Sequence, residues 1–586
     1  MRQSSSLSPQ RRQADFDRVA GRPVDVLVVG GGVTGAGTAL DAASRGLSVA
    51  LVEAQDWAAG TSSRSSKLVH GGLRYLQMLD FRLVHEALRE RSLLLQRLAP
   101  HLVRPVPVLY PLRRPFLERL YVGAGVALYD ILGLSMGNGR GLPLHRHLTK
   151  RQALATAPGL DPRALSGAVL YYDAQVDDAR YVVELVRTAV SYGAVALNRT
   201  RVVGFRSESG RARGVTVEDV ETGALYQVEA RVTVLATGAW TEETEALAGV
   251  ERTVRIRPSK GAHILVKREK LAVTTGLILR TDRSVLFVLP WGEHWLIGTT
   301  DTDWSYSKAR PLATRADVDY LLAELNKVVV KPLVSQDVEA VFAGLRPLVA
   351  GSGVVRGPGE GRSGTGGGAA TTKLSREHAV SRPAPGLVVV SGGKYTTYRV
   401  MAADAVDAAV ADAQFEVPPS PTAKVPLLGA GAFQEMWEAR HRFARDHGLS
   451  PEQAEHLLHR YGGLAGEVIG LAASRPDLAE PVPGARHYLK AEVEYSVAHE
   501  GALHVEDVLA RRTRVSMETP DGGVASAAAV ARIMGPLLGW DDAKEAAEVA
   551  DYGRQAQLVA QSANTAQDDS QAARLAEEAP TLLRLP

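Results

Sequence analysis

The sequence predicts an α/β protein with a Rossmann-like dinucleotide-binding domain, an inserted mixed-sheet domain and a C-terminal α-helical domain. Three observations predict this fold class. Residues 24–53 read as a strand, a glycine-rich turn, a helix and a second strand. Strand-like runs alternate with turns between residues 246 and 383. From residue 430 to about 560 the apolar residues recur with helical spacing.

The bulk composition excludes several classes of function. The chain has 586 residues, enough for several domains, and 45% of them are hydrophobic. Lys and Arg total 68 against 65 Asp and Glu, and this balance argues against a nucleic-acid-binding protein. The chain has no cysteine, which excludes disulfides, cysteine-ligated iron–sulfur clusters, thiolate zinc sites and cysteine nucleophiles.

The first of these features is a dinucleotide-binding fingerprint, VDVLVVGGGVTGAGTALDAASRGLSVALVE at 24–53. Gly30 permits the tight turn, Gly32 lets a pyrophosphate approach the backbone, and Gly35 lets the helix pack closely on the strand. The unpaired N–H groups at the start of the helix, near Thr34, favour a bound phosphate. The order of strand, glycines, helix and second strand makes the prediction specific.

Two sequence features indicate which dinucleotide, NAD, NADP or FAD, the fingerprint binds. Glu53 ends the second strand, where its carboxylate can bind ribose hydroxyls and would repel the 2′-phosphate of NADP. A further apolar strand, RVTVLATGAW at 231–240, ends in Ala-Thr-Gly. Such a strand returning to the nucleotide, with Gly238 close to it, is typical of two-dinucleotide-binding flavoproteins. The sequence therefore predicts FAD as the cofactor.

Four further motifs carry a family resemblance: TSSRSSKLVHGGLRYL at 61–76, GLRPL at 344–348, LSREHAV at 374–380 and SGGKYTTYR at 391–399. With these motifs the chain resembles the FAD-dependent (aerobic, respiratory) glycerol-3-phosphate dehydrogenases over nearly its whole length after Val24. The resemblance implies that sn-glycerol 3-phosphate is oxidised to dihydroxyacetone phosphate by hydride transfer from C2 to FAD N5. It also implies that the electrons pass to a membrane quinone. The alternatives are an oxidase that uses oxygen, a related amino-acid oxidase, and a non-catalytic flavin-binding protein.

The resemblance also implies which residues contact FAD. In this family the serine-rich 61–76 segment wraps the pyrophosphate and the flavin, and the 391–399 segment closes over the flavin. His70 has two interpretations, a flavin contact or a hydrogen bond to the loop backbone. The predicted cofactor-binding residues are Gly30, Gly32, Thr34, Gly35, Glu53, Thr61, Ser62, Ser65, Ser66, Lys67, Leu68, His70, Gly71, Gly238, Gly393, Thr396 and Thr397.

A phosphate dianion requires fixed cations, preferably guanidinium groups that bind two oxygens at once. The matching positions predict a substrate site made of Arg74, Tyr75, Arg346, Arg376 and Lys394. Among the catalytic residues, Arg346 is predicted to stabilise the developing alkoxide and the phosphate. The base stays open between His263 and Lys394. His263 lies in a predicted strand, KGAHILV at 260–266, and titrates near neutral pH, although it can also be a hydrogen-bonded histidine of the sheet. Lys394 can serve if burial lowers its pKa.

The predicted boundaries make the FAD-binding domain discontinuous. A glycine-rich run at 351–373 is interpreted as a surface loop. The predicted parts are a disordered tail at 1–22, FAD-binding segments at 23–100, 170–245 and 384–415, substrate-binding segments at 101–169 and 246–383, a helical domain at 430–560, and a loosely ordered tail at 561–586.

A basic and apolar region bears on the location of the protein. LRRPFLER at 112–119 precedes LYVGAGVALYDILGL at 120–134, which is shorter than a membrane span of roughly 18–20 residues. It is interpreted either as a core helix or as a peripheral contact with anionic lipid. A cytoplasmic homodimer on the inner face of the plasma membrane is expected. No metal site is predicted, since His456 and His459 lack further ligands nearby.

Overall fold

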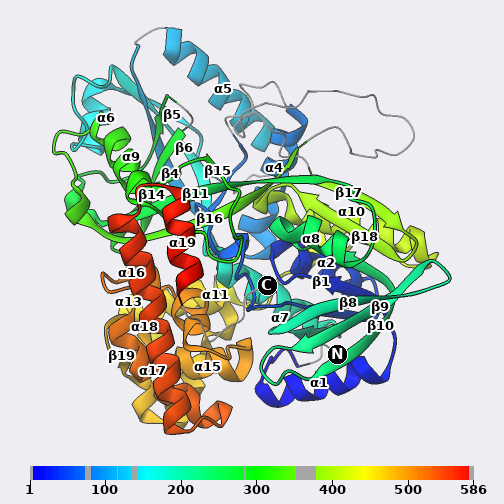
Figure 1. The fold of residues 1–586 in the computed structure, drawn as a ribbon. Coiled ribbons are helices and arrows are strands. Elements are labelled where there is room, and N and C mark those ends of the chain that lie inside the picture. The colour runs from blue at the N-terminus through cyan, green and yellow to red at the C-terminus, as the bar shows by residue number, and fades with distance from the viewer. Residues whose placement is uncertain are drawn as a thin grey trace.

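The structure is a computed structural model that describes residues 4–72, 81–114, 117–134, 142–282, 285–350 and 378–579. It contains two large sheets and a helical C-terminal region (Figure 1). The first sheet has eight strands within the described residues, and its main path follows the order β17-β18-β10-β1-β2-β7. Its strands are β1 (Val24–Val29), β2 (Val49–Val52), β7 (Val195–Leu197), β8 (Thr200–Glu208), β9 (Arg211–Asp219), β10 (Leu225–Leu235), β17 (His378–Ala384) and β18 (Leu387–Gly392).

The central strands of this sheet are parallel and covered on both faces, as their continuous apolar sequence requires. Val26 and Val28 of β1 pack into the cluster formed with three helices, whereas Leu27 and Val29 belong to the core on the opposite face. The carboxyl ends of β1, β2, β10 and β18 therefore meet at one edge, where a ligand can bind. The three helices are α2 (Val33–Ser44), α7 (Asp178–Ser191) and α10 (Tyr398–Ala413).

The second sheet has ten strands within the described residues and is mostly antiparallel, which fits the predicted mixed sheet. Its longest pairing joins β11 and β16, with Ser259 opposite Arg346. Its strands are β3 (Leu68–Val69), β4 (Val103–Leu112), β5 (Arg146–Thr149), β6 (Gly167–Val176), β11 (Arg255–Lys267), β12 (Gly276–Arg280), β13 (Val285–Trp291), β14 (His294–Gly298), β15 (Thr302–Asp303) and β16 (Val338–Ala350).

Further helices pack against the second sheet or lie in the segments that connect the two sheets. Figure 1 shows α5 at the edge of the molecule, away from the helical C-terminal region. These helices are α4 (Phe81–Leu93), α5 (Leu117–Leu134), α6 (Lys150–Thr156), α8 (Thr241–Leu247) and α9 (Arg315–Asn326). Of the helices in the described ranges, none is both long enough and apolar enough to span a bilayer.

The C-terminal region is helical, as predicted, with one small hairpin of β19 (Pro481–Val482) and β20 (Ala485–Leu489). It has its own apolar cores. Its helices are α11 (Phe433–Glu438), α12 (Arg440–Asp446), α13 (Pro451–Tyr461), α14 (Ala465–Ser474), α15 (Lys490–Glu500), α16 (Val515–Glu518), α17 (Val524–Leu538), α18 (Asp542–Thr565) and α19 (Asp569–Glu578).

The prediction of a disordered tail at 1–22 is wrong for most of that segment, because α1 (Pro9–Gly21) is a capped helix. The Ser8 side chain accepts a hydrogen bond from the Arg11 N–H. Phe16 is fully buried and stacks on Tyr226, with ring centroids 4.5 Å apart. An apolar face packed on the first sheet therefore orders this segment.

The prediction of a loosely ordered tail at 561–586 is also wrong as far as the described residues extend. α18 continues to Thr565, and α19 follows. Ala566 accepts a hydrogen bond from the Arg315 N–H at 2.9 Å, and Asp569 forms an ion pair with the buried Lys260 of β11. Partners far away in the sequence thus fix the C-terminal helices against the second sheet.

Two predicted domain boundaries also move. β6 pairs with β4 from Gly167 to Val176, so the boundary placed at residue 170 cuts through a strand of the second sheet. β17 pairs with β18 of the first sheet, although residues 378–383 were assigned to the substrate domain. In both cases strand pairing, which the sequence does not reveal, decides the assignment.

A buried histidine joins the first sheet to the C-terminal region and predicts a pH dependence of stability. His504 Nδ1 lies 2.9 Å from Glu548 Oε1, and its Nε2 lies 2.9 Å from Glu221 Oε1. Burial and the charge of Arg199 lower the pKa of His504, but the hydrogen bonds to both glutamates outweigh them and raise this pKa to about 9. The stabilisation of the fold by protonated His504 is therefore complete below about pH 6.5 and is lost as the pH rises through about 9.

We expect His504→Gln to lower the melting temperature at pH 6.5 and to have a smaller effect at pH 9.5. The difference in unfolding free energy should shrink by on the order of 3 kcal/mol across this range. Calorimetry of both proteins at matched pH values measures it. A difference that stays constant with pH would show that His504 is uncharged in the folded protein.

Candidate active site: a dinucleotide cavity with cationic walls

The turn after β1 has the geometry that the glycine fingerprint predicts. Gly30 has φ +110°, and a Cβ there would lie 2.6 Å from the Ala236 carbonyl oxygen. Gly32 precedes α2, whose Val33 N–H donates to Ser62 Oγ at 3.0 Å. A Cβ on Gly35 would lie 1.8 Å from the Gly30 carbonyl oxygen, so this glycine permits the helix to pack on the turn.

Glu53 stands at the end of β2, beside this turn. Its carboxylate accepts the Gly31 N–H at 2.6 Å and the Gln55 N–H at 2.8 Å. Burial raises the pKa of Glu53, and the two backbone hydrogen bonds act in the opposite direction. The carboxyl group is therefore fixed at the edge of the cavity, where it can accept hydrogen bonds from a ribose.

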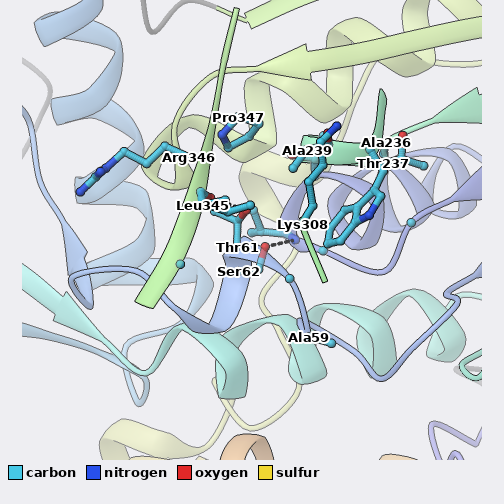
Figure 2. A pocket seen from close by; sticks show the side chains of 18 of the residues that line it. Ala59, Thr61, Ser62, Ala236, Thr237, Ala239, Lys308, Leu345, Arg346 and Pro347 are labelled. Carbon is cyan, nitrogen blue, oxygen red and sulfur yellow. Dashed lines mark hydrogen bonds between the residues drawn. The ribbon is translucent and has the colours of Figure 1, made fainter. Parts of the chain in front are cut away.

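A cavity of about 690 Å³ extends from this turn to the second sheet (Figure 2). Its walls come from the ends of β1, β2, β10 and β18, from the 59–66 segment, and from β11 and β16. Figure 2 shows Thr61 and Ser62 near Leu345 and Arg346 of β16. The predicted site residues that line the cavity are Gly30, Gly32, Thr34, Glu53, Thr61, Ser62, Ser65, Ser66, Leu68, His70, Gly238, His263, Arg346, Gly393, Lys394 and Thr396.

Lys67 was predicted to contact the cofactor, but it is absent from the cavity wall, and its side chain binds other parts of the chain. The ammonium group is buried and donates to the Ser63 carbonyl at 2.6 Å and to Asp178 Oδ1 at 2.8 Å. Burial and the nearby charge of Arg514 lower the pKa of Lys67 to about 8, while Asp178 acts in the opposite direction. Lys67 therefore stabilises the loop that forms the cavity.

Three other predicted cofactor residues are also absent from the cavity wall: Gly35, Gly71 and Thr397. Gly71 has turned toward the protein core, where its N–H donates to Tyr129 Oη at 2.8 Å. A Cβ on Gly71 would lie 2.3 Å from Leu88 Cδ2. Tight packing against α4 and α5 is sufficient to account for a glycine at this position.

Arg346 lies on β16 in the wall of the cavity. Its Nη2 donates to Thr299 Oγ1 at 3.0 Å and to the Thr300 carbonyl at 3.2 Å. The Asp301 carboxylate lies 3.7 Å from Nη1. The guanidinium group is thus held in position by the segment after β14. Lys394, at the turn before α10, lines the same cavity.

His263 lies on β11, as predicted, and also lines the cavity. His263 is 2% exposed, and the centroid of its ring lies 4.8 Å from that of the Phe342 ring, on which it stacks. Nε2 lies 2.8 Å from Ser66 Oγ, whereas Nδ1 is buried with no hydrogen-bond partner among the described residues. Burial, then the charges of Arg346 and Lys67, hold the pKa of His263 well below its usual range, so the imidazole is neutral at pH 7.

Arg74, Tyr75, Arg376 and the glycine-rich run at 351–373 lie outside the described residues. Two cavity residues, in contrast, were missed by the sequence analysis. Burial lowers the pKa of Arg64, in the serine-rich segment, to about 10. Lys308 donates to the Ala239 carbonyl at 2.7 Å. The position of Arg64 inside a quoted motif was a usable signal, whereas no motif surrounds Lys308.

A glycine beside Arg346 provides a test of this geometry. A Cβ on Gly261 would lie 2.4 Å from Arg346 Nη2 and 2.6 Å from Thr299 Oγ1. We expect Gly261→Ala to displace the guanidinium group and to lower kcat/KM about 10²-fold, because small misplacements are costly in an active site. Steady-state kinetics measure this. The control is Gly204→Ala, also in a strand, where a Cβ meets nothing within 4 Å; equal effects of the two substitutions would contradict the prediction.

The comparisons with known proteins agree with this geometry. Residues 25–412 match the profile of the FAD-dependent oxidoreductases, and residues 420–545 match the C-terminal domain of alpha-glycerophosphate oxidase. The fold and the cavity thus define an FAD-dependent oxidoreductase. The glycine turn, Glu53 and the serine-rich wall have the chemistry that FAD requires, and the family model confirms the predicted cofactor.

The particular family follows from the relatives. The chain is 49% identical to the glycerol-3-phosphate dehydrogenase of Mycobacterium leprae, over 98% of this chain and 95% of that one. It is 35% identical to the mitochondrial glycerol-3-phosphate dehydrogenase of Bos taurus, over 90% and 72% of the two chains. The crystal structure of the Bacillus halodurans glycerol-3-phosphate dehydrogenase complexed with FAD superposes with a TM-score of 0.76 at 26% identity, covering 96% and 99%. The chain belongs to the FAD-dependent glycerol-3-phosphate dehydrogenase family, which confirms the predicted family and fold class.

Proposed function

We propose that this protein oxidises sn-glycerol 3-phosphate to dihydroxyacetone phosphate. Bound FAD would supply the acceptor for the C2 hydride, at its N5, while a base of the protein would take the proton of the C2 hydroxyl. The observation that carries the proposal is that Arg346 and Lys394 line the same cavity as the dinucleotide turn. Two cations in that wall suit a phosphate dianion. Relatives 49% identical to this chain are named for this substrate, which supports the proposal.

The proposal assigns a role in binding or in proton transfer to the side chains in the cavity wall. Arg346 is held by Thr299 and Thr300, so its fork can bind the phosphate or the developing alkoxide without reorganisation. His263 is neutral and can accept the hydroxyl proton, but burial and the nearby Arg346 charge, which lower its pKa, make it a weak base. Lys394 is the alternative base. Arg74, Tyr75 and Arg376 are proposed to complete the substrate site.

The test is an anaerobic titration of the purified yellow protein with sn-glycerol 3-phosphate and no electron acceptor. Rapid loss of the oxidised flavin absorbance band is the expected result, and dihydroxyacetone phosphate should form in equal amount. A flavin that stays oxidised with this compound but is reduced by an amino acid would overturn the substrate and retain the class of enzyme.

For the electron acceptor we propose a membrane quinone, with oxygen as the alternative. The support is that the relatives are named dehydrogenases. The reduced protein is mixed with a water-soluble quinone analogue without air, and separately with air-saturated buffer. Faster reoxidation by the quinone supports a dehydrogenase. Fast reoxidation by oxygen with formation of peroxide would make the protein an oxidase.

We propose that α5 contacts an anionic membrane surface on the cytoplasmic side. Leu120 is 73% and Tyr121 is 60% exposed near the start of α5, and Arg113 and Arg114 just before it are exposed as well. Apolar side chains beside basic ones suit an anionic bilayer surface. We expect the protein to sediment with phosphatidylglycerol vesicles more than with phosphatidylcholine vesicles, and Leu120→Glu to weaken this; equal sedimentation would contradict it.

The homodimer also stays a prediction. Sedimentation velocity of the purified protein measures its oligomeric state.

A further inference from the structure

A short segment of the C-terminal region reaches the FAD-binding domain beside the cavity. Residues 511–514 lie at the end of the π-helical turn η11 (Asp507–Arg512) and carry three buried arginines, Arg511, Arg512 and Arg514. We call these three residues the arginine clamp. Each of them binds a carboxylate that lies more than 300 positions earlier in the chain.

The first anchor of the clamp is Asp56. Arg512 binds it with both terminal nitrogens, Nη1 to Oδ2 at 2.7 Å and Nη2 to Oδ1 at 2.6 Å, and both side chains are fully buried. Arg511 Nε donates to the same carboxylate. The next residue, Trp57, packs its ring on the dinucleotide turn, since a Cβ on Gly31 would lie 2.7 Å from Trp57 Cε3. This anchor therefore fixes the start of the cavity-lining segment against the turn.

The second anchor is at the other end of the same segment. Arg514 donates to Asp177 Oδ1 from Nη2 at 2.6 Å, and Nη2 also contacts Asp178. Asp178 in turn accepts hydrogen bonds from the N–H and the Oγ of Ser65, at 2.9 and 2.7 Å, and from the Lys67 ammonium group. The end of the segment is thus tied to Arg514 through the Asp178 carboxylate and through the Ser63 carbonyl, which accepts a hydrogen bond from Arg514 Nη1 at 3.4 Å.

Residues 59–66 between the two anchors make much of the cavity wall. This segment also contacts the dinucleotide turn through Ser62 and β16 through Thr61, whose Oγ1 donates to the Leu345 carbonyl at 2.7 Å. Removing one partner of a buried ion pair leaves a charge without compensation, which strongly disfavours the original geometry. A change at the clamp should therefore reach the cavity through Asp56 and Asp178.

From this arrangement we infer that the C-terminal region retains the cofactor: Arg512 and Arg514 are positioning residues that hold the 56–67 segment in the shape that binds FAD. The clamp contacts the wall of the cavity from behind and lines none of it. It therefore acts on the affinity for FAD, and the chemistry at the bound flavin is expected to be unchanged. A purely structural role would lower stability without a specific effect on FAD affinity.

The experiment compares Arg512→Gln and Arg514→Gln with Arg486→Gln. Arg486 lies in the same C-terminal region, but its side chain is 73% exposed and pairs with Glu293 at the surface. FAD is removed from each protein and titrated back while the quenching of flavin fluorescence is followed. We expect the Kd for FAD to rise about tenfold or more in both clamp variants and less than twofold in the control. Excess FAD should restore the rate of flavin reduction.

A Kd within twofold of the wild type in folded clamp variants would overturn the inference, as would an equal rise in Arg486→Gln. So would a rate that stays low at saturating FAD, because the clamp would then affect the chemistry. If either glutamine variant fails to fold, Arg512→Lys and Asp56→Glu keep the charges and alter only the geometry of the first anchor. A raised Kd in these two variants supports the inference, and an unchanged Kd overturns it.

Discussion

Arg346→Ala is expected to retain FAD and to lose reduction of the flavin by sn-glycerol 3-phosphate. The guanidinium group is fixed by Thr299 Oγ1 at 3.0 Å and by the Thr300 carbonyl at 3.2 Å, so its charge is available where the substrate would bind. Removal of one such preorganised donor typically lowers the rate about 10²–10³-fold. Stopped-flow absorbance without air measures the rate constant for reduction directly, separately from any acceptor.

The control variants separate charge from geometry. Arg346→Lys keeps the charge without the planar fork, and we expect it to recover part of the rate. Arg315→Ala removes a partly exposed arginine that pairs with Asp319 on α9, and we expect no effect. Reduction at the normal rate in Arg346→Ala, with FAD bound, would show that the substrate binds elsewhere.

The parts of the fold that the sequence predicted well depend on residues close together in the chain. The fingerprint at 24–53 is a local pattern, and the structure shows β1, the Gly30 turn, α2 and β2 within it. The strand that carries His263 was also recognised from its apolar neighbours. Local backbone requirements and burial on both faces leave few other structures for such stretches.

Lys67 and the two chain ends show why other parts could not be predicted. The role of Lys67 depends on Asp178, which lies 111 positions later in the chain and pairs with Lys67 in the interior. The helix at 9–21 depends on Phe16 meeting Tyr226, and the C-terminal helix depends on Asp569 meeting Lys260. A charged or apolar side chain in a polar segment gives no sign of such a partner, because the contact exists only after the sheets have formed.

Gly35→Ala is expected to abolish tight binding of FAD. A Cβ at this position would lie 1.8 Å from the Gly30 carbonyl oxygen, well inside any allowed contact. The turn has little room to yield, because Gly30 itself adopts φ +110° and faces the Ala236 carbonyl. α2 must therefore move away from the turn, and the N–H groups of its first turn move away from the pyrophosphate position. The FAD content of the purified protein, read from its visible spectrum, should fall to a small fraction.

The loss of FAD binding in Gly35→Ala must be separated from the general effect of a glycine-to-alanine substitution in a helix. Gly470 lies inside α14, is exposed, and a Cβ there would meet nothing within 4 Å. Gly470→Ala should leave the FAD content unchanged and stabilise the helix by up to about 1 kcal/mol. Crowding at Gly35 should instead cost about 1–3 kcal/mol of stability and lower the melting temperature even without FAD. A Gly35→Ala protein that binds FAD normally would mean that α2 can shift without disturbing the phosphate site, and the steric account of this glycine would fail.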